Sequence, residues 1–469
     1  MDRREVLRAA GVVTGGVLGA ALTGGAASAE PGASGSGAAG PPIGAGAPGP
    51  GAASGAAAAP AFTLMTTATR VAARTDRRPV AGAVHDPAVD TTFISWGGLN
   101  EDSYVQSYDH ATRVWSAKQK VLDGGGDSHN YPTLVLAADG HLLLFVGMHN
   151  QALVVARSPR PHSAAGTWTV ADIAPAASYP MPFRTPCGHL FVFYRETSQE
   201  VDPSAPTDTR PMLYVRSTDH GRTWKSSVQL TGHPYAIGST TRADHLNEEY
   251  VGQLRHDPAR DRVHLVWTKA GGGPTQNVHD YYHKDIHHAT FDPGTLRFRS
   301  AAGRDLGTQI GDPDQDGPCL VATTALVRPA GMKSPDYIQL TGWLDDGKPF
   351  VVWFTYDDAA VSHVMASVWT GSAWSTREVA TGVRTREMER IGPNTWRVYG
   401  TRFGQPDIHT FLLTSGRTWT AETTIRTPRE IQRIDLVAGF RDPVRIVATG
   451  ASSAREVTVA DGDIHTAGL

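Results

Sequence analysis

The chain has 469 residues, of which 43 are Lys or Arg and 46 are Asp or Glu, so its formal net charge is −3. This near-balance excludes the broad basic surface that is typical of nucleic-acid-binding proteins. Hydrophobic residues make up 40% of the chain and charged residues 19%, which is typical of a globular protein with many turns and not of a disordered chain or a coiled coil. Two cysteines, Cys187 and Cys319, are too few for a disulfide scaffold, although a bridge between them stays open.

The first 29 residues have the features of an export signal. Arg3 and Arg4 precede an apolar run rich in Gly and Ala, which ends in the A-x-A cleavage site at residues 27–29. The paired arginines predict the twin-arginine route and a secreted protein. A transmembrane anchor is the alternative, but the run is short and rich in glycine, and no later segment is apolar enough to predict membrane contact. Residues 30–60 are nearly all Gly, Ala, Pro and Ser and are expected to form a flexible linker, which leaves residues 61–469 as a single folded domain.

One strand pattern recurs seven times after the linker. Each copy is an apolar segment entered by a polar turn, and the copies are residues 92–96, 139–145, 187–193, 261–267, 346–353, 394–399 and 442–447. A second recurring element is a strand expected to end in Trp, at Trp115, Trp168, Trp224, Trp374 and Trp419. No long segment shows helical periodicity, so we expect an all-β fold, a seven-bladed β-propeller, with a β-sandwich carrying insertions as the alternative. The loops of a propeller gather on one face, where a ligand would bind.

Residues 217–224 match the pattern S-x-D-x-G-x-T-W, the Asp-box turn of sialidase-like propellers. In such a turn, Asp219 is expected to cap backbone amides, Gly221 to adopt a positive φ, and Trp224 to pack between blades. The motif indicates the fold and carries no information about chemistry.

Polar residues lie in the loops that flank several expected strands. Because inner strands of neighbouring blades point at the same central funnel, we expect these side chains to converge there. The set comprises His129 and Asn130 in the segment 127–132, His149 after the strand that begins at residue 141, Tyr194 at the matching end of the next blade's strand, Arg210 before the strand 212–215, and Tyr250 at the opening of the strand 250–254. Each residue alone is most simply a packing or surface residue, and only the shared placement points to a site.

The segments D-S-H-N-Y-P and G-M-H-N, the strand end F-Y-R, Arg210 and the Asp-box together resemble the BNR-4 propeller family, over about residues 85–330. That family includes the ulvan lyases, which are polysaccharide lyases built on seven-bladed propellers. The resemblance implies that His129, Tyr194 and Arg210 are catalytic residues. It also implies that His149, Tyr250 and Asn130 contact the substrate, an acidic polysaccharide.

The chemistry of β-elimination fits this set of residues. The C5 proton of a uronate becomes removable when a cation neutralises the carboxylate, and the guanidinium of Arg210 pairs with carboxylates in a bidentate fork. Tyr194 would remove that proton and protonate the leaving O4, if nearby cations lower its pKa from about 10 toward neutrality. His129 would act as a second base on the opposite face of the sugar, so that both glucuronate and iduronate react. His149 would hold the carboxylate or position Tyr194.

A histidine-rich segment, residues 279–288, is followed by Cys319. Histidine and cysteine favour zinc, and the resemblance implies a structural metal in this part of the chain. We expect His279, His283 and Cys319 as ligands, with another histidine as the fourth. The spacing matches no standard zinc motif, so a solvated polar loop stays open as the alternative.

These observations predict a secreted, monomeric polysaccharide lyase that cleaves rhamnose–uronate linkages and needs no organic cofactor. A sialidase-type hydrolase is one alternative, but it requires an arginine triad, and the group of Arg70, Arg74 and residues 77–78 lacks a matching set. A carbohydrate-binding propeller without catalysis is the other. It would keep an aromatic funnel and dispense with the His, Tyr and Arg set.

Overall fold

The computed structural model describes residues 60–71, 82–124, 132–147, 149–205, 207–240, 242–272, 279, 281–325, 339–357, 359, 361–450 and 461–469. The expected export signal and nearly all of the linker lie outside these residues. The described part is built almost wholly from β-strands, which confirms the all-β prediction. Its helices are short: a 3-10 turn at Leu99–Glu101, α2 (Ser198–Val201), α3 (Ser227–Thr231) and α4 (Asp312–Gln315). Among the described helices, none has the length and apolar character that a membrane span needs.

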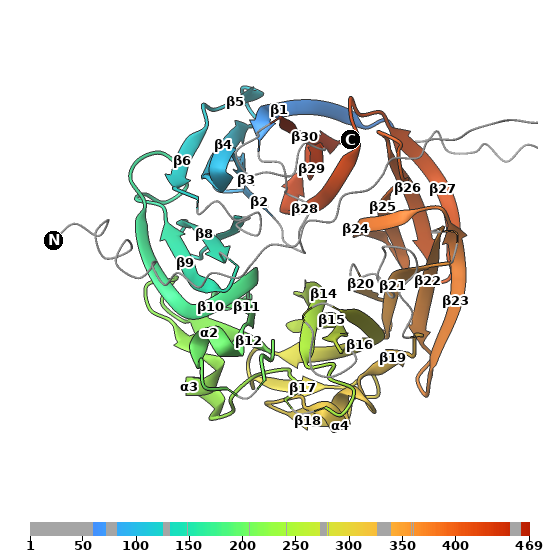
Figure 1. Cartoon of the computed structure of the whole chain (residues 1–469). Helices are drawn as coiled ribbons and strands as arrows, with labels where there is room; N and C mark the ends of the chain where they lie inside the picture. The colour runs from blue at the N-terminus through green and yellow to red at the C-terminus, as the bar shows by residue number, and fades with distance from the viewer. Residues whose placement is uncertain are drawn as a thin grey trace, which may run out of the picture. The chain divides into compact units, whose positions relative to one another are not determined.

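The strands form sheets that follow one another around a ring (Figure 1). The first sheet has nine strands: β1 (Thr63–Val71), β30 (Gly462–Gly468), β29 (Val444–Gly450), β28 (Ile431–Arg441), β2 (Ala83–Asp86), β3 (Thr91–Gly97), β4 (Ser103–Asp109) and β5 (Val114–Trp115) in this order, with β6 (Gln119–Leu122) beside β4. The second has seven: β7 (Thr133–Leu136), β8 (Leu142–Gly147), β9 (Gln151–Arg157), β10 (Thr169–Arg184), β11 (Leu190–Glu196), β12 (Met212–Ser217) and β13 (Lys225–Ser226).

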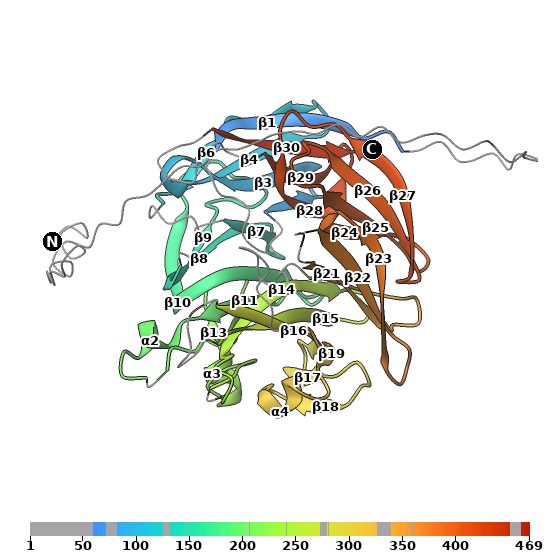
Figure 2. The same ribbon diagram turned by 45° about the vertical axis from the view of Figure 1, so that its right-hand side comes forward.

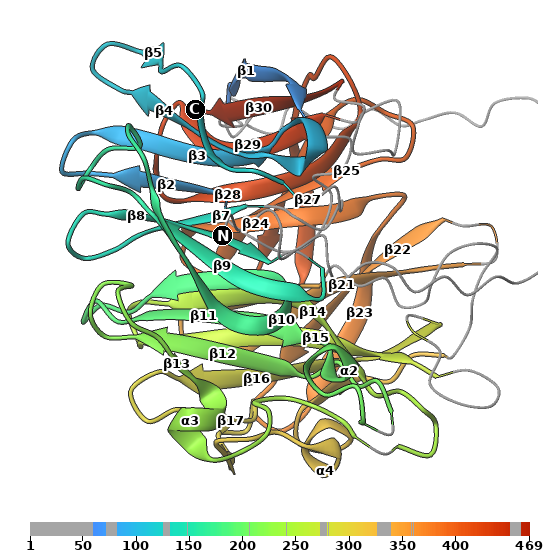
Figure 3. The same ribbon diagram turned by 60° about the vertical axis from the view of Figure 1, so that its left-hand side comes forward.

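Three further sheets complete the described part of the ring. The third sheet contains β14 (Glu248–Asp257), β15 (Arg262–Gly271), β16 (Tyr282–Asp292), β17 (Arg297–Arg299) and β18 (Asp305–Gly307), with β19 (Leu320–Ala322) beside β16. The fourth contains β20 (Leu340–Trp343), β21 (Pro349–Tyr356), β22 (Ser362–Trp369) and β23 (Trp374–Thr381), and the fifth β24 (Arg384–Gly392), β25 (Thr395–Thr401), β26 (Ile408–Thr414) and β27 (Thr418–Ile425). Figure 3 shows the second and third sheets from the side, with β10–β12 next to β14–β16.

All seven copies of the apolar pattern are strands. They fall in β3, β8, β11, β15, β21, β25 and β29, and the core of each is buried. The prediction that a second set of strands ends in Trp is wrong for four of its five copies. Trp374 and Trp419 stand at or next to the start of β23 and β27, while Trp168 and Trp224 directly precede β10 and β13. In these four copies the Trp stands at or next to the start of a strand and not at its end. The sequence pattern alone does not show whether the strand precedes or follows the Trp.

The hydrogen-bonded sheets do not separate into seven units, because some strands are shared. The first part of β10, up to Ala177, pairs with β9, and its later part, from Ala177 to Arg184, pairs with β11. A parallel bridge between Val84 and Ala438 likewise joins β2 to β28. The ring also brings the two ends of the described chain together, because β1 pairs antiparallel with β30 from Thr63 opposite Gly468 onwards (Figure 2).

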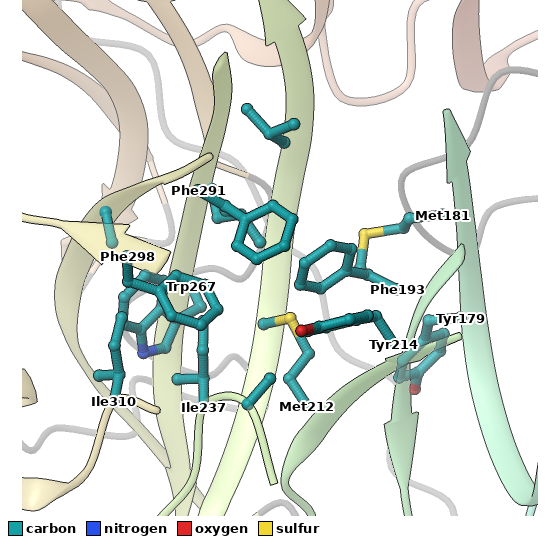
Figure 4. Packing of buried hydrophobic residues seen from close by; sticks show 14 of the residues in the cluster. Tyr179, Met181, Phe193, Met212, Tyr214, Ile237, Trp267, Phe291, Phe298 and Ile310 are labelled. Carbon is teal, nitrogen blue, oxygen red and sulfur yellow. The ribbon is translucent and has the colours of Figure 1, made fainter. Parts of the chain in front are cut away.

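An aromatic cluster fills the space between β11–β12 and β14–β16 (Figure 4). The ring of Phe193 lies 5.0 Å from that of Tyr214, and both lie 5.3 Å from the ring of Phe291 on β16. Trp267 of β15 is fully buried in the same cluster, where its indole Nε1 donates a hydrogen bond to Gln315 Oε1 of α4. Contacts between aromatic rings of this kind depend on their relative orientation, so the cluster fixes the second sheet against the third. The candidate site lies where the same strands end.

The Asp-box forms as the sequence predicts. Asp219 accepts hydrogen bonds from the Thr223 hydroxyl and from the backbone amides of Thr223 and Arg222, and these bonds outweigh partial burial and lower its pKa to about 2. Gly221 has a φ of 84°, in the left-handed region that favours glycine. Trp224 packs edge-on against Phe145 of β8. The turn therefore links the β12–β13 end of the second sheet to its β8 strand.

Candidate functional site

Arg210 lies just before β12 and is fixed against the start of β14. Its backbone amide donates to the carbonyl of Asn247, and its own carbonyl accepts from the amide of Glu249. Its guanidinium Nη2 donates to Asp208 Oδ2 at 3.1 Å, and its Nε lies 3.8 Å from Glu248 Oε1. The cation is therefore held at the point where the second sheet meets the third, between one partly exposed carboxylate and one that is fully buried.

His279 sits on the other side of the Glu248 carboxylate. Its Nδ1 donates to both carboxylate oxygens of Glu248 at 2.9 Å, and its Nε2 accepts a hydrogen bond from Arg210 Nη1 at 3.3 Å. Burial raises the pKa of Glu248, but the hydrogen bond from His279 and the charges of the neighbouring arginines outweigh it, so that pKa lies below its usual value. An imidazole whose Nδ1 is held by an ionised carboxylate presents Nε2 as a base, and the His279 side chain is 41% exposed.

A second cation lies beneath this group. Arg195, near the end of β11, is completely buried, and its guanidinium carbon lies 4.5 Å from the ring centre of Tyr179 and 4.6 Å from that of Tyr250. Tyr250 in turn packs against His283, with ring centres 4.6 Å apart. Burial raises the pKa of Tyr250, and the positive charge of Arg195 opposes that rise. Tyr179 has a φ of 62°, which is unusual for a bulky residue and places its ring over Arg195.

Tyr194 lies on the opposite side of β11 from Arg195, because successive side chains of a strand alternate. It is buried in an apolar cluster with Leu153 of β9 and Leu213 of β12. Burial there raises the pKa of the phenol. The base role predicted for Tyr194 requires a shift in the other direction, so the structure lends that role no support and it stays a prediction.

His149 lies in the turn that follows β8, whereas Tyr194 lies within its strand, so the two do not occupy matching positions. The turn is tied to the second sheet through the next residue: Thr197 Oγ1, just past β11, donates to Asn150 Oδ1 at 2.5 Å. The turn that contains His149 therefore lies near the end of β11, where Arg195 is found. The other two sequence-predicted residues, His129 and Asn130, lie outside the described residues.

The expected zinc ligands do not assemble. His279 binds Glu248, His283 packs against Tyr250, and Cys319 lies in the aromatic cluster. Burial raises the pKa of the Cys319 thiol, which disfavours the thiolate that zinc requires. Across the described ranges, no three His, Cys, Asp or Glu side chains are grouped so that they could hold a metal ion. The structural zinc therefore stays an untested prediction, and both cysteines are free thiols.

A buried carboxyl group stands directly behind the site. Glu249 is fully buried and accepts from Gln315 Nε2 at 3.0 Å and from Ser239 Oγ at 3.3 Å. Burial raises its pKa to about 7, although these hydrogen bonds and the nearby Lys269 oppose the rise. Lys269 is itself buried and paired with Asp316.

This carboxyl group predicts a pH dependence of stability. Because the folded state raises the Glu249 pKa from 4.5 to about 7, the folded state binds the proton more tightly than the unfolded chain does. The resulting stabilisation is complete below about pH 4.5 and is lost as the pH rises to about 7, on the order of 3 kcal/mol. Glu249→Gln keeps the shape without titrating, so its thermal midpoint should change less across this range than that of the parent protein. An equal change in both proteins would show that Glu249 is already ionised at low pH.

A family model for BNR_4, described as a BNR repeat-containing family member, matches residues 91–381. The chain belongs to the BNR_4 family. The match includes Arg195, Arg210, Glu248, Tyr250 and His279, so the whole described site lies in the part of the chain that this family shares. It ends before β24.

Two named relatives and one similar solved structure are ulvan lyases. The chain is 23% identical over 243 residues to "Ulvan Lyase-PL25" of Pseudoalteromonas sp. (strain PLSV), covering 46% of this chain and 47% of that protein. It is 22% identical over 270 residues to "Ulvan lyase" of Alteromonas sp. (strain LOR), covering 50% and 51%. The chain thus aligns with about half the length of these relatives. A structure of the PL25 ulvan lyase bound to -[GlcA(1-4)Rha3S]- superposes with a TM-score of 0.65 at 15% identity, covering 85% of this chain and 94% of that one.

The structure adds three residues to the candidate site that sequence reasoning missed, namely Glu248, Arg195 and Tyr179. The sequence offered a weak signal for the first, because Glu248 stands two residues before Tyr250, where the sequence pattern places the opening of a strand. It offered none for the Arg195–Tyr179 contact, which depends on a bulge in β10 between Ser178 and Met181.

Proposed function

We propose that this protein is a polysaccharide lyase that cleaves rhamnose–uronate linkages by β-elimination and leaves an unsaturated uronate at the new end. The observation that carries the proposal is the placement of Arg210 between the His279–Glu248 pair and Asp208, beside the Tyr250–Arg195 stack. The likeness to ulvan lyases in sequence and fold supports the same reaction class.

In this proposal Arg210 neutralises the uronate carboxylate. Its present partner Asp208 is partly exposed, and a substrate carboxylate would take that partner's place on the guanidinium fork. Neutralising the carboxylate stabilises the negative charge that develops when C5 loses its proton. Glu248 stays buried below the guanidinium and keeps it in position.

Proton transfer then needs a base and an acid. His279 Nε2 takes the C5 proton, the electron pair of the broken C5–H bond forms the C4–C5 double bond, and the C4–O4 bond breaks with its electron pair left on O4. The phenol of Tyr250 gives its proton to the departing O4, and the charge of Arg195 behind the ring stabilises the phenolate that remains. His129 and Tyr194 remain the groups that the sequence pattern predicts for the same transfers.

The proposal also includes a seven-bladed β-propeller as the fold. We assign the strands to seven blades: β2–β5, β7–β10, β10–β13, β14–β17, β20–β23, β24–β27, and β28–β30 with β1. Their pairing supports this division, with β10 shared between two blades and β1 closing the last one. Export by the twin-arginine route, action outside the cell on an acidic polymer and a monomeric state belong to the proposal and rest on the sequence.

Incubation with ulvan, and with a neutral polysaccharide as the control, tests the reaction class. Ultraviolet absorbance of an unsaturated uronate is expected to rise with ulvan only. New reducing ends without this absorbance would identify a hydrolase instead. Binding without either signal would leave a carbohydrate-binding protein, and both results would contradict the proposal.

A further inference from the structure

An aromatic and cationic cluster lies on the fourth and fifth sheets, away from the site described above. Phe403, in the turn after β25, is 77% exposed, more than any other large hydrophobic side chain in the described part of the chain. The guanidinium carbon of Arg384, the first residue of β24, lies 5.1 Å from its ring centre and 5.6 Å from that of Tyr356, the last residue of β21. We call these three residues the Phe403 cluster.

The Phe403 cluster and the Arg210 site lie on the same face of the ring. Three turns at the opposite strand ends are bonded to one another: Arg260, between β14 and β15, donates to the carbonyl of Asp345, between β20 and β21, whose amide donates to Asn394, between β24 and β25. These turns therefore share one face. The other ends of the same antiparallel strands, which carry the Arg210 site and the Phe403 cluster, share the opposite face.

The positive charge of the Phe403 cluster favours an acidic ligand. Arg384 makes no ion pair with the residues that the structure describes, whereas Arg397 of β25 and Arg426, directly after β27, both pair with carboxylates. Exposed Arg402 adds a second positive charge beside Phe403. An exposed aromatic ring stacks on the apolar face of a sugar, and an unpaired guanidinium binds a carboxylate or sulfate through its fork.

We propose that the Phe403 cluster is a distal binding site for acidic polysaccharide, which holds a stretch of polymer remote from the Arg210 site. The benefit of this distal site to catalysis rests on the proposed function. A polysaccharide bound at two places on the protein is held more tightly than one bound at a single site. The binding itself requires no reaction. The cluster extends beyond the part of the chain matched by the BNR_4 model, because Arg384 and Phe403 follow residue 381.

The test compares Phe403→Ala, Arg384→Gln and their double variant with Arg390→Gln. Arg390 is an exposed arginine of the same strand, β24, but it pairs with Asp345 in the turns of the opposite face, so its variant loses the same charge elsewhere. Affinity electrophoresis in gels containing ulvan is expected to show roughly five- to tenfold weaker retention of the double variant and unchanged retention of Arg390→Gln. Thermal midpoints should stay within a few degrees, because the altered side chains are at the surface.

Catalysis gives the second readout. KM for long ulvan should rise by a similar factor with kcat unchanged, while short oligosaccharides that reach only the Arg210 site should react as before. Equal retention of all variants would overturn the proposal, as would equal losses in Arg390→Gln or equal binding to a neutral polymer. A dimer in sedimentation that Phe403→Ala abolishes would show that a second copy covers the cluster instead. If ulvan is bound through Phe403 and no unsaturated product forms, the distal site stands and the lyase reaction fails.

Discussion

Arg210→Gln is expected to lower the turnover of ulvan by about 10²–10³-fold, the usual loss when one preorganised electrostatic contact to developing charge is removed. Glutamine can still donate a hydrogen bond but carries no charge, so the uronate carboxylate would stay anionic beside C5 and oppose loss of the proton. The rate of increase in ultraviolet absorbance from unsaturated uronate, measured at saturating polymer, reports this loss directly.

Stability must be separated from catalysis in this variant, because Glu248 is buried and Arg210 is one of its cationic neighbours. His279 still binds that carboxylate, so the fold should persist with a lower thermal midpoint. Arg210→Lys keeps the charge and loses the fork, and it should retain more turnover than Arg210→Gln at a comparable midpoint. If lysine and glutamine reduce turnover equally, charge neutralisation at this position is not the source of catalysis.

Local patterns in the sequence were sufficient to find the seven recurring apolar strands. A strand such as β8 or β11 is buried along nearly its whole length and is entered by a turn with a Gly at positive φ, Gly140 or Gly188, so both its apolar run and its start are visible in the sequence. The capping role of Asp219 in the Asp-box could be predicted for the same reason, since the partners of its carboxylate lie within eight residues. The sharing of β10 between two strand groups could not, because it depends on which neighbours each half meets.

The site was harder to predict because its contacts join distant parts of the chain. The sequence pattern marked the end of β11 as a place of interest and predicted Tyr194 there, whereas the side chain that meets Tyr250 in the structure belongs to Arg195. Adjacent residues of a strand point to opposite faces, and both faces of β11 are buried. The hydrophobic periodicity of the sequence therefore could not show whether Tyr194 or Arg195 faces the site. The histidine neighbours of His279 predict a metal ligand at this position. In the structure its imidazole binds Glu248, which stands 31 residues earlier in the sequence.

Tyr250→Phe, compared with Tyr194→Phe, decides which phenol transfers the proton. Each change removes one hydroxyl group and keeps the ring, so each folded structure should be retained. Tyr250→Phe is expected to lower kcat by about 10²-fold with little change in KM, the usual contribution of one general acid. Its ring still covers Arg195, so the thermal midpoint should move little. Tyr194→Phe should cost less turnover, because that hydroxyl is buried among leucine side chains and burial has raised its pKa.

The pH profile distinguishes loss of an acid from loss of packing. If Tyr250 protonates O4, kcat in the parent protein should fall at high pH as the phenol ionises, and this alkaline limb should disappear from the residual activity of Tyr250→Phe. Burial raises the pKa of Tyr250, which moves the alkaline limb to higher pH, and the charge of Arg195 opposes this rise. Arg195→Met removes that charge and should therefore move the limb to still higher pH. A larger loss in Tyr194→Phe, with the alkaline limb intact in Tyr250→Phe, would assign the proton transfer to Tyr194 and would require the strand end at β11 to open during catalysis.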